Sequence, residues 1–230
     1  MPRLSVRLDV LLDRIGLCMS RGHRIDGLWV GCLTSDKEKR LMAFDPVEEA
    51  LGLIKRHDPL RYDRLRRDLV RIWVFLLAGN WGEYRHPLRM CVLDERVVLD
   101  EATRSEQIAS TIVHEATHAR LMRRGIGYEG ALRARIEAVC FRRQRAFAAR
   151  LPPGGAAQED AQRRLTGYPE EFWTDASFRE RRDQGAAEVF HYLGMSETFT
   201  RNAFRLAALV RRVGDFIERL KAPFRRRRPF

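Results

Sequence analysis

The sequence predicts an α+β fold that is predominantly helical and contains a small sheet. Most of the 230 residues fall in stretches whose apolar side chains recur with the spacing of an amphipathic helix. Met90–Leu93 and Val97–Leu99 are short β-type runs separated by Asp94-Glu95-Arg96, and they predict a hairpin. Hydrophobic residues make up 45% of the chain, as in folded globular domains. We therefore expect one domain over residues 1–221, followed by a basic tail at residues 222–230 that we expect to be disordered.

Helix signals occur on both sides of the predicted hairpin. Asp45-Pro46-Val47-Glu48 combines an N-cap, a first-turn proline and an acid at the capping-box position. Asp58-Pro59 predicts a second helix that ends at Gly79-Asn80, whereas Gly27–Leu33 predicts an additional strand. The inward-facing residues expected in that second helix are Leu65, Leu69, Ile72, Trp73 and Leu76. Three further helices are expected around Ala161, at Asp183–Leu193 and at Phe199–Leu220.

The segment His114-Glu115-Ala116-Thr117-His118 is an H-E-x-x-H motif in a stretch that predicts helix. Thr103-Arg104-Ser105-Glu106 fits a capping box before it, and apolar residues follow with helical spacing. Residues four apart lie on one helix face, so the two imidazoles can bind one zinc ion. Glu115 is then placed to take a proton from water that the metal activates. The alternative is a pair of ordinary helix histidines.

A catalytic zinc ion takes three protein ligands plus water, so a third ligand is needed. Residues 121–125 contain no histidine, and Glu137 lies 19 residues after His118. The segment Gly130–Leu151 predicts a helix that Pro152-Pro153-Gly154-Gly155 ends. On that helix Glu137 shares a face with Cys140, Phe141, Phe147, Ala148 and Leu151. A carboxylate on an apolar face is costly unless it is paired or bound to metal. An ion pair with a neighbouring arginine is the alternative, and the other candidate ligands are Glu129, Glu188 and His191.

The motif and the downstream glutamate together resemble the gluzincin arrangement of zinc metallopeptidases, a zincin-type fold. The chain is also similar in size to small bacterial and phage gluzincins that cleave regulators inside the cell. The resemblance covers roughly Met90–Leu151 and is specific only at His114, Glu115, His118 and Glu137. It implies that His114, His118 and Glu137 are zinc ligands and that Glu115 is the general base. It also implies that the strand before the motif helix lines the cleft, where an extended peptide adds to its edge. The alternative for this hairpin is that it only covers the helix.

An oxyanion-stabilising donor is expected outside the ligand set. His191 and Tyr192 are adjacent in the C-terminal half and are the catalytic candidates for this role. Tyr128, in the glycine-flanked turn Gly125-Ile126-Gly127-Tyr128, is another candidate. The alternative is that these side chains cap the core through single hydrogen bonds.

Composition limits the compartment and the partners. No apolar run is long enough for a transmembrane segment, and Asp9 and Asp13 make the N-terminus unlike a signal peptide. Four cysteines without paired spacing favour reduced thiols, and we expect a cytoplasmic protein. The formal net charge is +12, and the one dense basic cluster is Arg225–Arg228. Weak contact of this cluster with nucleic acid or an anionic membrane surface is the alternative to a disordered tail.

These observations favour a zinc-dependent metallopeptidase that acts on a protein or peptide substrate, with Glu115 as the base. One alternative is a catalytically silent zinc-binding or regulatory module whose arginine-rich surface contacts nucleic acid or a protein partner. The other is a helical structural protein whose histidines never bind metal.

Overall fold

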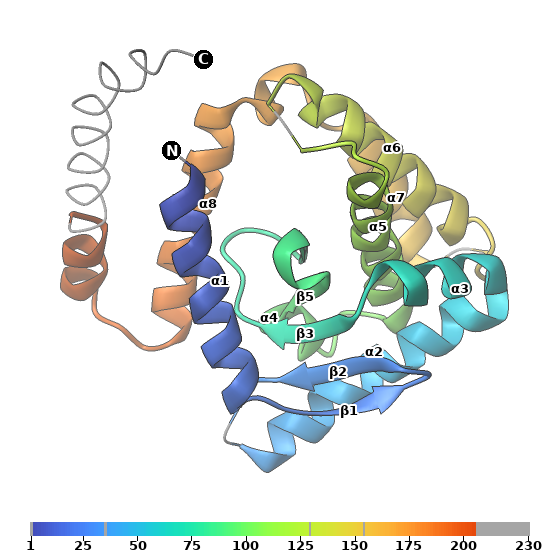
Figure 1. The fold of residues 1–230 in the computed structure, drawn as a ribbon, viewed down its shortest axis with the longest axis horizontal. Coiled ribbons are helices and arrows are strands. Elements are labelled where there is room, and N and C mark those ends of the chain that lie inside the picture. The colour runs from blue at the N-terminus through green and yellow to red at the C-terminus, as the bar shows by residue number, and fades with distance from the viewer. Residues whose placement is uncertain (1, 35, 129, 154, 206–230) are drawn as a thin grey trace, which may run out of the picture.

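A five-stranded mixed sheet lies at the centre of the fold, in the strand order β1-β2-β3-β5-β4. The computed structural model describes residues 2–34, 36–128, 130–153 and 155–205. The strands are β1 (Arg21–Ile25), β2 (Leu28–Cys32), β3 (Arg71–Phe75), β4 (Gly82–Arg85) and β5 (Met90–Asp94). The helices are α1 (Pro2–Met19), α2 (Lys37–His57), α3 (Pro59–Asp68), α4 (Glu95–Val98), α5 (Ser105–Arg123), α6 (Arg133–Ala148), α7 (Ala156–Thr166) and α8 (Asp175–Tyr192). Short 3-10 turns η1 (His86–Leu88), η2 (Gly130–Leu132) and η3 (Glu170–Trp173) join them. The predominantly helical α+β class is confirmed (Figure 1).

Strands β1 and β2 form an antiparallel hairpin around Asp26 and Gly27. Both residues have positive φ, 50° and 88° respectively. Two consecutive positive φ values define the type I′ turn that Asp-Gly favours in two-residue hairpins. The expected strand at Gly27–Leu33 is confirmed as β2, whereas β1 was not predicted although Asp26-Gly27 signals its position.

Strand β3 corrects the helix that was expected to run from Asp58-Pro59 to Gly79. The helix α3 ends at Asp68, and Leu69 is already extended, with φ −101° and ψ 153°. β3 pairs in parallel with β2 on one side and with β5 on the other. A strand buried on both faces appears in the sequence as a continuous apolar run, which helical periodicity also accommodates.

The expected hairpin of Met90–Leu93 and Val97–Leu99 is wrong. The first run is strand β5, but the second lies mainly in helix α4, which begins immediately after Asp94. The Asp94 carboxylate accepts a hydrogen bond from the Arg96 backbone N–H at 2.8 Å and is ion-paired with the Arg96 guanidinium. This N-cap converts a β-branched run into a helical turn. The antiparallel partner of β5 is β4, which precedes it in the chain.

Two helices begin at other residues than the sequence predicted. Helix α2 is capped by Asp36 rather than Asp45, and Pro46 lies inside it. At the start of α5, the Gln107 side chain accepts from the Arg104 backbone N–H at 3.0 Å, one residue later than the predicted Thr103 box.

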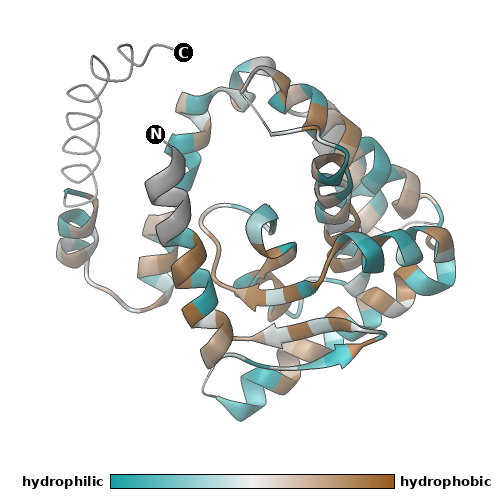
Figure 2. Ribbon diagram, viewed as in Figure 1, coloured by the Kyte–Doolittle hydropathy of each residue, from teal (hydrophilic) through white to brown (hydrophobic). Residues whose placement is uncertain are grey.

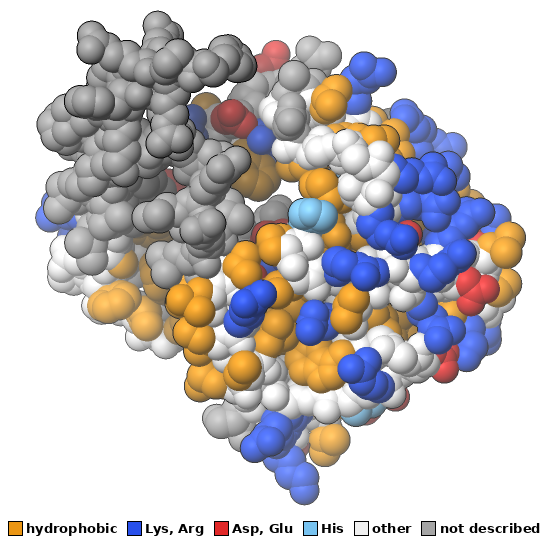
Figure 3. Space-filling model, viewed as in Figure 1, with side chains coloured by type: hydrophobic (Ala, Val, Ile, Leu, Met, Phe, Trp, Pro, Cys, Tyr) orange, Lys and Arg blue, Asp and Glu red, His pale blue; other side chains and the backbone are white. Residues whose placement is uncertain are grey.

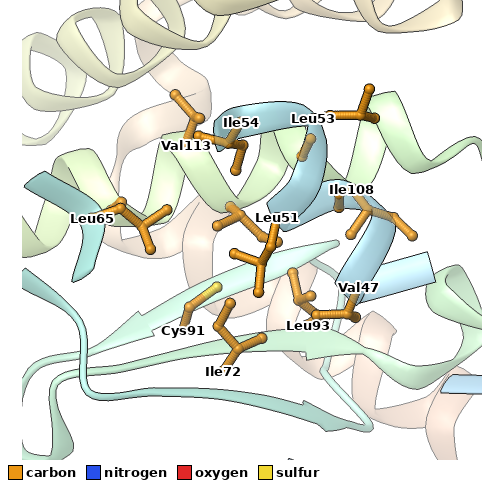
Figure 4. Packing of buried hydrophobic residues seen from close by; sticks show 14 of the residues in the cluster. Val47, Leu51, Leu53, Ile54, Leu65, Ile72, Cys91, Leu93, Ile108 and Val113 are labelled. Carbon is orange, nitrogen blue, oxygen red and sulfur yellow. The ribbon is translucent and has the colours of Figure 1, made fainter. Parts of the chain in front are cut away.

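The main core lies between one face of the sheet and helices α2, α3 and α5. Figure 4 shows its residues converging from these elements, and they include Val47, Leu51, Ile54, Leu65, Ile72, Cys91, Leu93, Ile108 and Val113. The opposite sheet face holds a smaller cluster of Trp73, Leu77, Met90 and Val92, against which Leu17 of α1 packs. Hydrophobic residues accordingly occur on strands β2 and β3, whereas the edge strand β1 is mostly hydrophilic (Figure 2). One side of helix α5 therefore packs in the core, and another side is available for other contacts.

The helices expected after residue 155 are present as α7 and α8, and residues 197–205 are helical as well. The rest of the helix expected at Phe199–Leu220, and the basic cluster Arg225–Arg228, lie outside the described residues. Among the helices that the structure describes, none has the length and apolarity needed to span a bilayer.

Candidate metal centre

Helices α5 and α6 pack against each other and bring the motif residues to face the predicted third ligand. α5 carries His114, Glu115 and His118, and α6 carries Glu137 and Cys140. His114 lies opposite the later part of α6 and His118 opposite its earlier part, so the two helices run antiparallel. All of these side chains except His118, which is half-buried, are buried. The structure thus brings the side chains of His114, His118 and Glu137 close together.

The donor atoms of this cluster are spaced as zinc ligands are. The Nε2 atoms of His114 and His118 are 3.1 Å apart. Glu137 Oε2 lies 3.2 Å from His114 Nε2, and Glu137 Oε1 lies 3.5 Å from His118 Nε2. Ligands held about 2.0–2.1 Å from an ion at tetrahedral angles lie roughly 3.3–3.4 Å from one another. The three observed separations bracket that value, so the residues present fit a zinc ion.

Two side chains outside the donor set orient the donors. The Gln144 Oε1 lies 3.1 Å from His114 Nδ1, where it can accept the Nδ1 proton and leave Nε2 free to bind metal. The Tyr128 hydroxyl donates a hydrogen bond to Glu137 Oε1. The sequence analysis considered Tyr128 as an oxyanion donor, but in the structure its hydroxyl is hydrogen-bonded to Glu137, a candidate metal ligand.

Cys140 is a donor that the sequence analysis did not consider as a ligand. One donor atom each from His114, His118 and Cys140 lie within 4.8 Å of one another. Glu137 and Cys140 are three residues apart, so one turn of α6 presents two alternative third donors. We favour Glu137 because its oxygens lie close to both Nε2 atoms and it lines a cavity, whereas Cys140 is not among the described residues that do. The sequence signal for Cys140 as a candidate ligand was its position three residues after Glu137, on the same apolar face of the predicted helix.

The ionisable groups of this cluster shift one another's pKa values. Burial raises the pKa of Glu115, and Glu137 adds to this effect, whereas the two histidines oppose it. Burial alone would lower the pKa of His118, but hydrogen bonds with Cys140 and Glu137 raise it well above its usual range. Burial likewise acts to raise the pKa of Glu137, yet its hydrogen bonds with His114 and His118 lower it overall.

A cavity of about 410 Å³ opens onto this cluster. His114, Glu115, His118 and Glu137 line it together with strand β4. An aromatic wall adjoins them, formed by Tyr128, Phe141, Tyr168, Phe172, Trp173 and Phe178. The Phe141 ring contacts His114, and the Tyr128 ring contacts His118. Figure 3 shows the surface hollowed near the centre of this view, with a histidine at the rim. A volume of this size falls within the range of small-molecule and substrate pockets.

The strand that borders the cavity is β4 and not the predicted Met90–Leu93. Gly82, Glu83 and Tyr84 of β4 line the cavity, and no residue of β5 does so among those described. β4 is an edge strand, whereas β5 is paired on both sides. A Cβ atom at Gly82 would lie 2.7 Å from Thr111 Cγ2 and 3.2 Å from Glu115 Oε1. Glycine at this position therefore allows the edge strand to lie directly against the candidate base.

The remaining predicted site residues lie elsewhere. His191 and Tyr192 are at the C-terminal end of α8, where Tyr192 is 45% exposed, and neither is among the described residues that line the cavity. Glu188 is exposed and lies 3.6 Å from the Arg96 guanidinium. Glu129 lies outside the described residues. The structure thus brings together His114, Glu115, His118 and Glu137 and does not bring His191 or Tyr192 to them.

Comparison with known proteins gave no match to the chain, whether with family models, curated protein sequences or solved structures. The function has to be inferred from the chemistry of the site.

Proposed function

We propose that this chain is a zinc-dependent peptidase whose metal ligands are His114, His118 and Glu137 and whose general base is Glu115. The observation that carries this proposal is the spacing of the donors at the wall of a cavity that Glu115 also lines. The two histidine Nε2 atoms are 3.1 Å apart, Glu137 Oε2 lies 3.2 Å from that of His114, and Glu137 Oε1 lies 3.5 Å from that of His118. A structural zinc site is closed by four protein ligands, whereas a catalytic one keeps a position open to substrate. Three donors lining a cavity of about 410 Å³ favour the catalytic kind.

A zinc ion bound here would act as a Lewis acid and lower the pKa of a water molecule to about 7. The Glu115 carboxylate takes the proton of the attacking water, whose oxygen bonds to the peptide carbonyl carbon. The C–N bond then breaks, and Glu115 returns the proton to the departing amine nitrogen. Burial raises the pKa of Glu115, which favours the transfer of a proton from water to its carboxylate.

The cavity walls suit an extended peptide with an apolar or aromatic side chain. β4 has one edge without a partner strand in the described sheet, so a substrate strand can add to it through backbone hydrogen bonds. The aromatic wall offers apolar surface to a substrate side chain. Arg181 lies at this wall, where its Nη1 donates to the Phe172 carbonyl at 2.7 Å and to Ser177 Oγ at 2.8 Å.

The test begins with the zinc content of the purified protein, measured by elemental mass spectrometry. We expect about one zinc ion per chain and loss of zinc in His118→Ala. Glu115→Gln should keep the zinc and lose peptide hydrolysis by about 10²–10⁴-fold, the usual contribution of a general base. Glu106→Gln, in the first turn of the same helix, is the matched control and should retain activity. Zinc binding without any hydrolysis in the parent chain, or full activity in Glu115→Gln, would overturn the proposal.

Cys140 favours a second candidate, a catalytically silent zinc-binding module. If its thiolate joined the two histidines and Glu137, four protein ligands would close the site. Cobalt substitution distinguishes the two, because a thiolate ligand gives an intense charge-transfer band in the near ultraviolet. If the chain is a peptidase with Glu137 as third ligand, the band should be absent. If the chain is the silent module, the band should be present and should be lost in Cys140→Ser. Cys91→Ser removes a buried thiol outside the cluster and serves as the control.

A further inference from the structure

A second hollow, of about 810 Å³, lies away from the metal cluster, between the end of α1, the strands β1 to β3 and the turn η1. Thirteen residues line it, and five of them are arginines: Arg14, Arg21, Arg24, Arg71 and Arg89. No aspartate or glutamate occurs among the described residues of its lining. We call this feature the arginine groove. Figure 3, in which β1 and β2 face the viewer, shows many Lys and Arg side chains and few acidic ones on this part of the surface.

No acidic side chain among the described residues neutralises the guanidinium groups of the arginine groove. None of the five forms an ion pair within the part of the chain that the structure describes. Three of them are held by backbone carbonyls instead. Arg24 Nη1 donates to Gly27 O at 2.7 Å, Arg71 Nη1 to Leu88 O at 3.2 Å, and Arg89 Nε to Asp68 O at 3.2 Å. Carbonyl contacts orient these groups and leave their net charge available to a ligand.

Trp29 provides a flat aromatic surface in the arginine groove. A Cβ atom at Gly31 would lie 2.2 Å from Trp29 Cη2, and one at Gly22 would lie 2.7 Å from Trp29 Cε2. Gly22 and Gly31 are paired across the β1–β2 hairpin. The indole ring therefore lies down on the sheet surface, in space that any other residue at these two positions would fill. Trp29 is only half-buried, so part of its ring faces the groove.

Strand register places charge on both sides of this ring. Trp29 pairs with Arg24 on β1 and with Arg71 on β3. Directly paired residues point to the same face of a sheet. Arg24 and Arg71 thus lie on neighbouring strands on either side of Trp29 and share its face of the sheet, and all three line the groove.

We propose that the arginine groove binds single-stranded nucleic acid, with a base stacked on Trp29 and backbone phosphates contacted by the arginines. Proteins that bind single strands combine a positively charged groove with exposed aromatic rings, because every base has a face that can stack. Arginine suits phosphate because its planar fork binds two oxygens at once. An unpaired strand is favoured over a duplex because bases inside a duplex cannot stack on a side chain. This proposal is independent of the peptidase proposal, because the two sites share no lining residue.

Fluorescence anisotropy with short labelled oligonucleotides tests the proposal on the full chain. The groove variant is the triple substitution Arg14→Gln, Arg24→Gln and Arg71→Gln. The matched control neutralises three exposed arginines of α6, Arg135, Arg142 and Arg143, and removes the same charge. We expect the groove variant to weaken binding and to reduce the slope of log K against log salt by about 2, since each phosphate contact on a single strand contributes about 0.7. The control should change both quantities much less.

Trp29→Leu measures the stacking contribution separately. Loss of one stacked base should weaken binding about 5- to 150-fold. Trp29→Phe keeps an aromatic face and should restore part of the binding, which distinguishes lost stacking from a folding defect. Equal weakening by the two triple variants, equal affinity for single strand and duplex, or binding only to anionic lipid vesicles would overturn the proposal.

Discussion

Gly185 and Gly52 both lie inside helices, and replacing each with alanine should change stability in opposite directions. Alanine is favoured over glycine in a helix interior by about 1 kcal/mol. At Gly52 of α2, a Cβ atom would meet only the mobile Arg56 side chain, 3.2 Å away. At Gly185 of α8, it would lie 2.1 Å from Gly79 N and 2.4 Å from Ala78 C.

The contact at Gly185 is with backbone, so no side-chain rotation can relieve it. Overpacking costs about 1–3 kcal/mol, and the upper end applies where backbone must move. Subtracting about 1 kcal/mol of helix propensity leaves Gly185→Ala destabilised by about 2 kcal/mol, while Gly52→Ala gains up to about 1 kcal/mol. In a chain of this size, 1 kcal/mol corresponds to about 2–4 °C in Tm.

Thermal unfolding followed by circular dichroism measures both variants against the parent. Because α8 carries Arg181 and Phe178 of the cavity wall, Gly185→Ala should also lower hydrolysis if the chain is a peptidase. The reasoning would be refuted if Gly185→Ala were as stable as the parent, or if both variants shifted Tm in the same direction.

Three further predictions concern the metal centre. Hydrogen bonds with Cys140 and Glu137 raise the pKa of His118, and a histidine binds zinc through a neutral ring, so zinc binding should release a proton. Zinc affinity should therefore rise with pH. Calorimetry in two buffers of different ionisation enthalpy should detect the released proton, and zinc binding without proton release would contradict the prediction. Tyr128→Phe removes the hydroxyl that donates to Glu137 and should lower zinc affinity about 10–100-fold in a chelator competition, with the far-ultraviolet spectrum unchanged. Unaltered affinity would show that the hydrogen bond does not orient the ligand. Gly82→Ala should displace the candidate base and reduce hydrolysis, while the control Gly155→Ala, whose nearest new contact is 3.7 Å away, should not; equal effects would refute the close approach of β4.

The motif residues were predictable because their arrangement is local. His114 and His118 share a helix face by virtue of their spacing alone, and the helix was clear from its apolar periodicity. Glu137 was predictable from the cost of a carboxylate on an apolar face. Cys140 was overlooked because the cysteines were judged by their spacing from one another, whereas its neighbours in the site are histidines from another helix.

The errors in the fold come from short apolar runs. Ile72, Trp73 and Leu76 fit a helix face, but Ile72–Val74 also fit a buried strand, and only the pairing of β3 with β2 and β5 decides between them. Val97 and Val98 have high β propensity, but the Asp94 cap and its Arg96 partner outweigh it. Which strand borders the cavity depends on sheet order, and sheet order depends on contacts distant in sequence. His191 and Tyr192 were chosen by residue type without a spatial constraint, and α8 carries them away from the cluster.

The donors of the metal centre all come from one antiparallel helix pair, α5 and α6, that is continuous in sequence apart from a short connection. Contacts between neighbouring segments form quickly during folding, whereas pairing of distant strands is slower. Metal capture would then need only this helix pair, before β4 reaches the sheet edge or α8 docks on the loop at Gly79. If the chain is a metallopeptidase, binding an ion and completing the cavity around it are thus separable events, and the metal could be bound before the substrate site has formed.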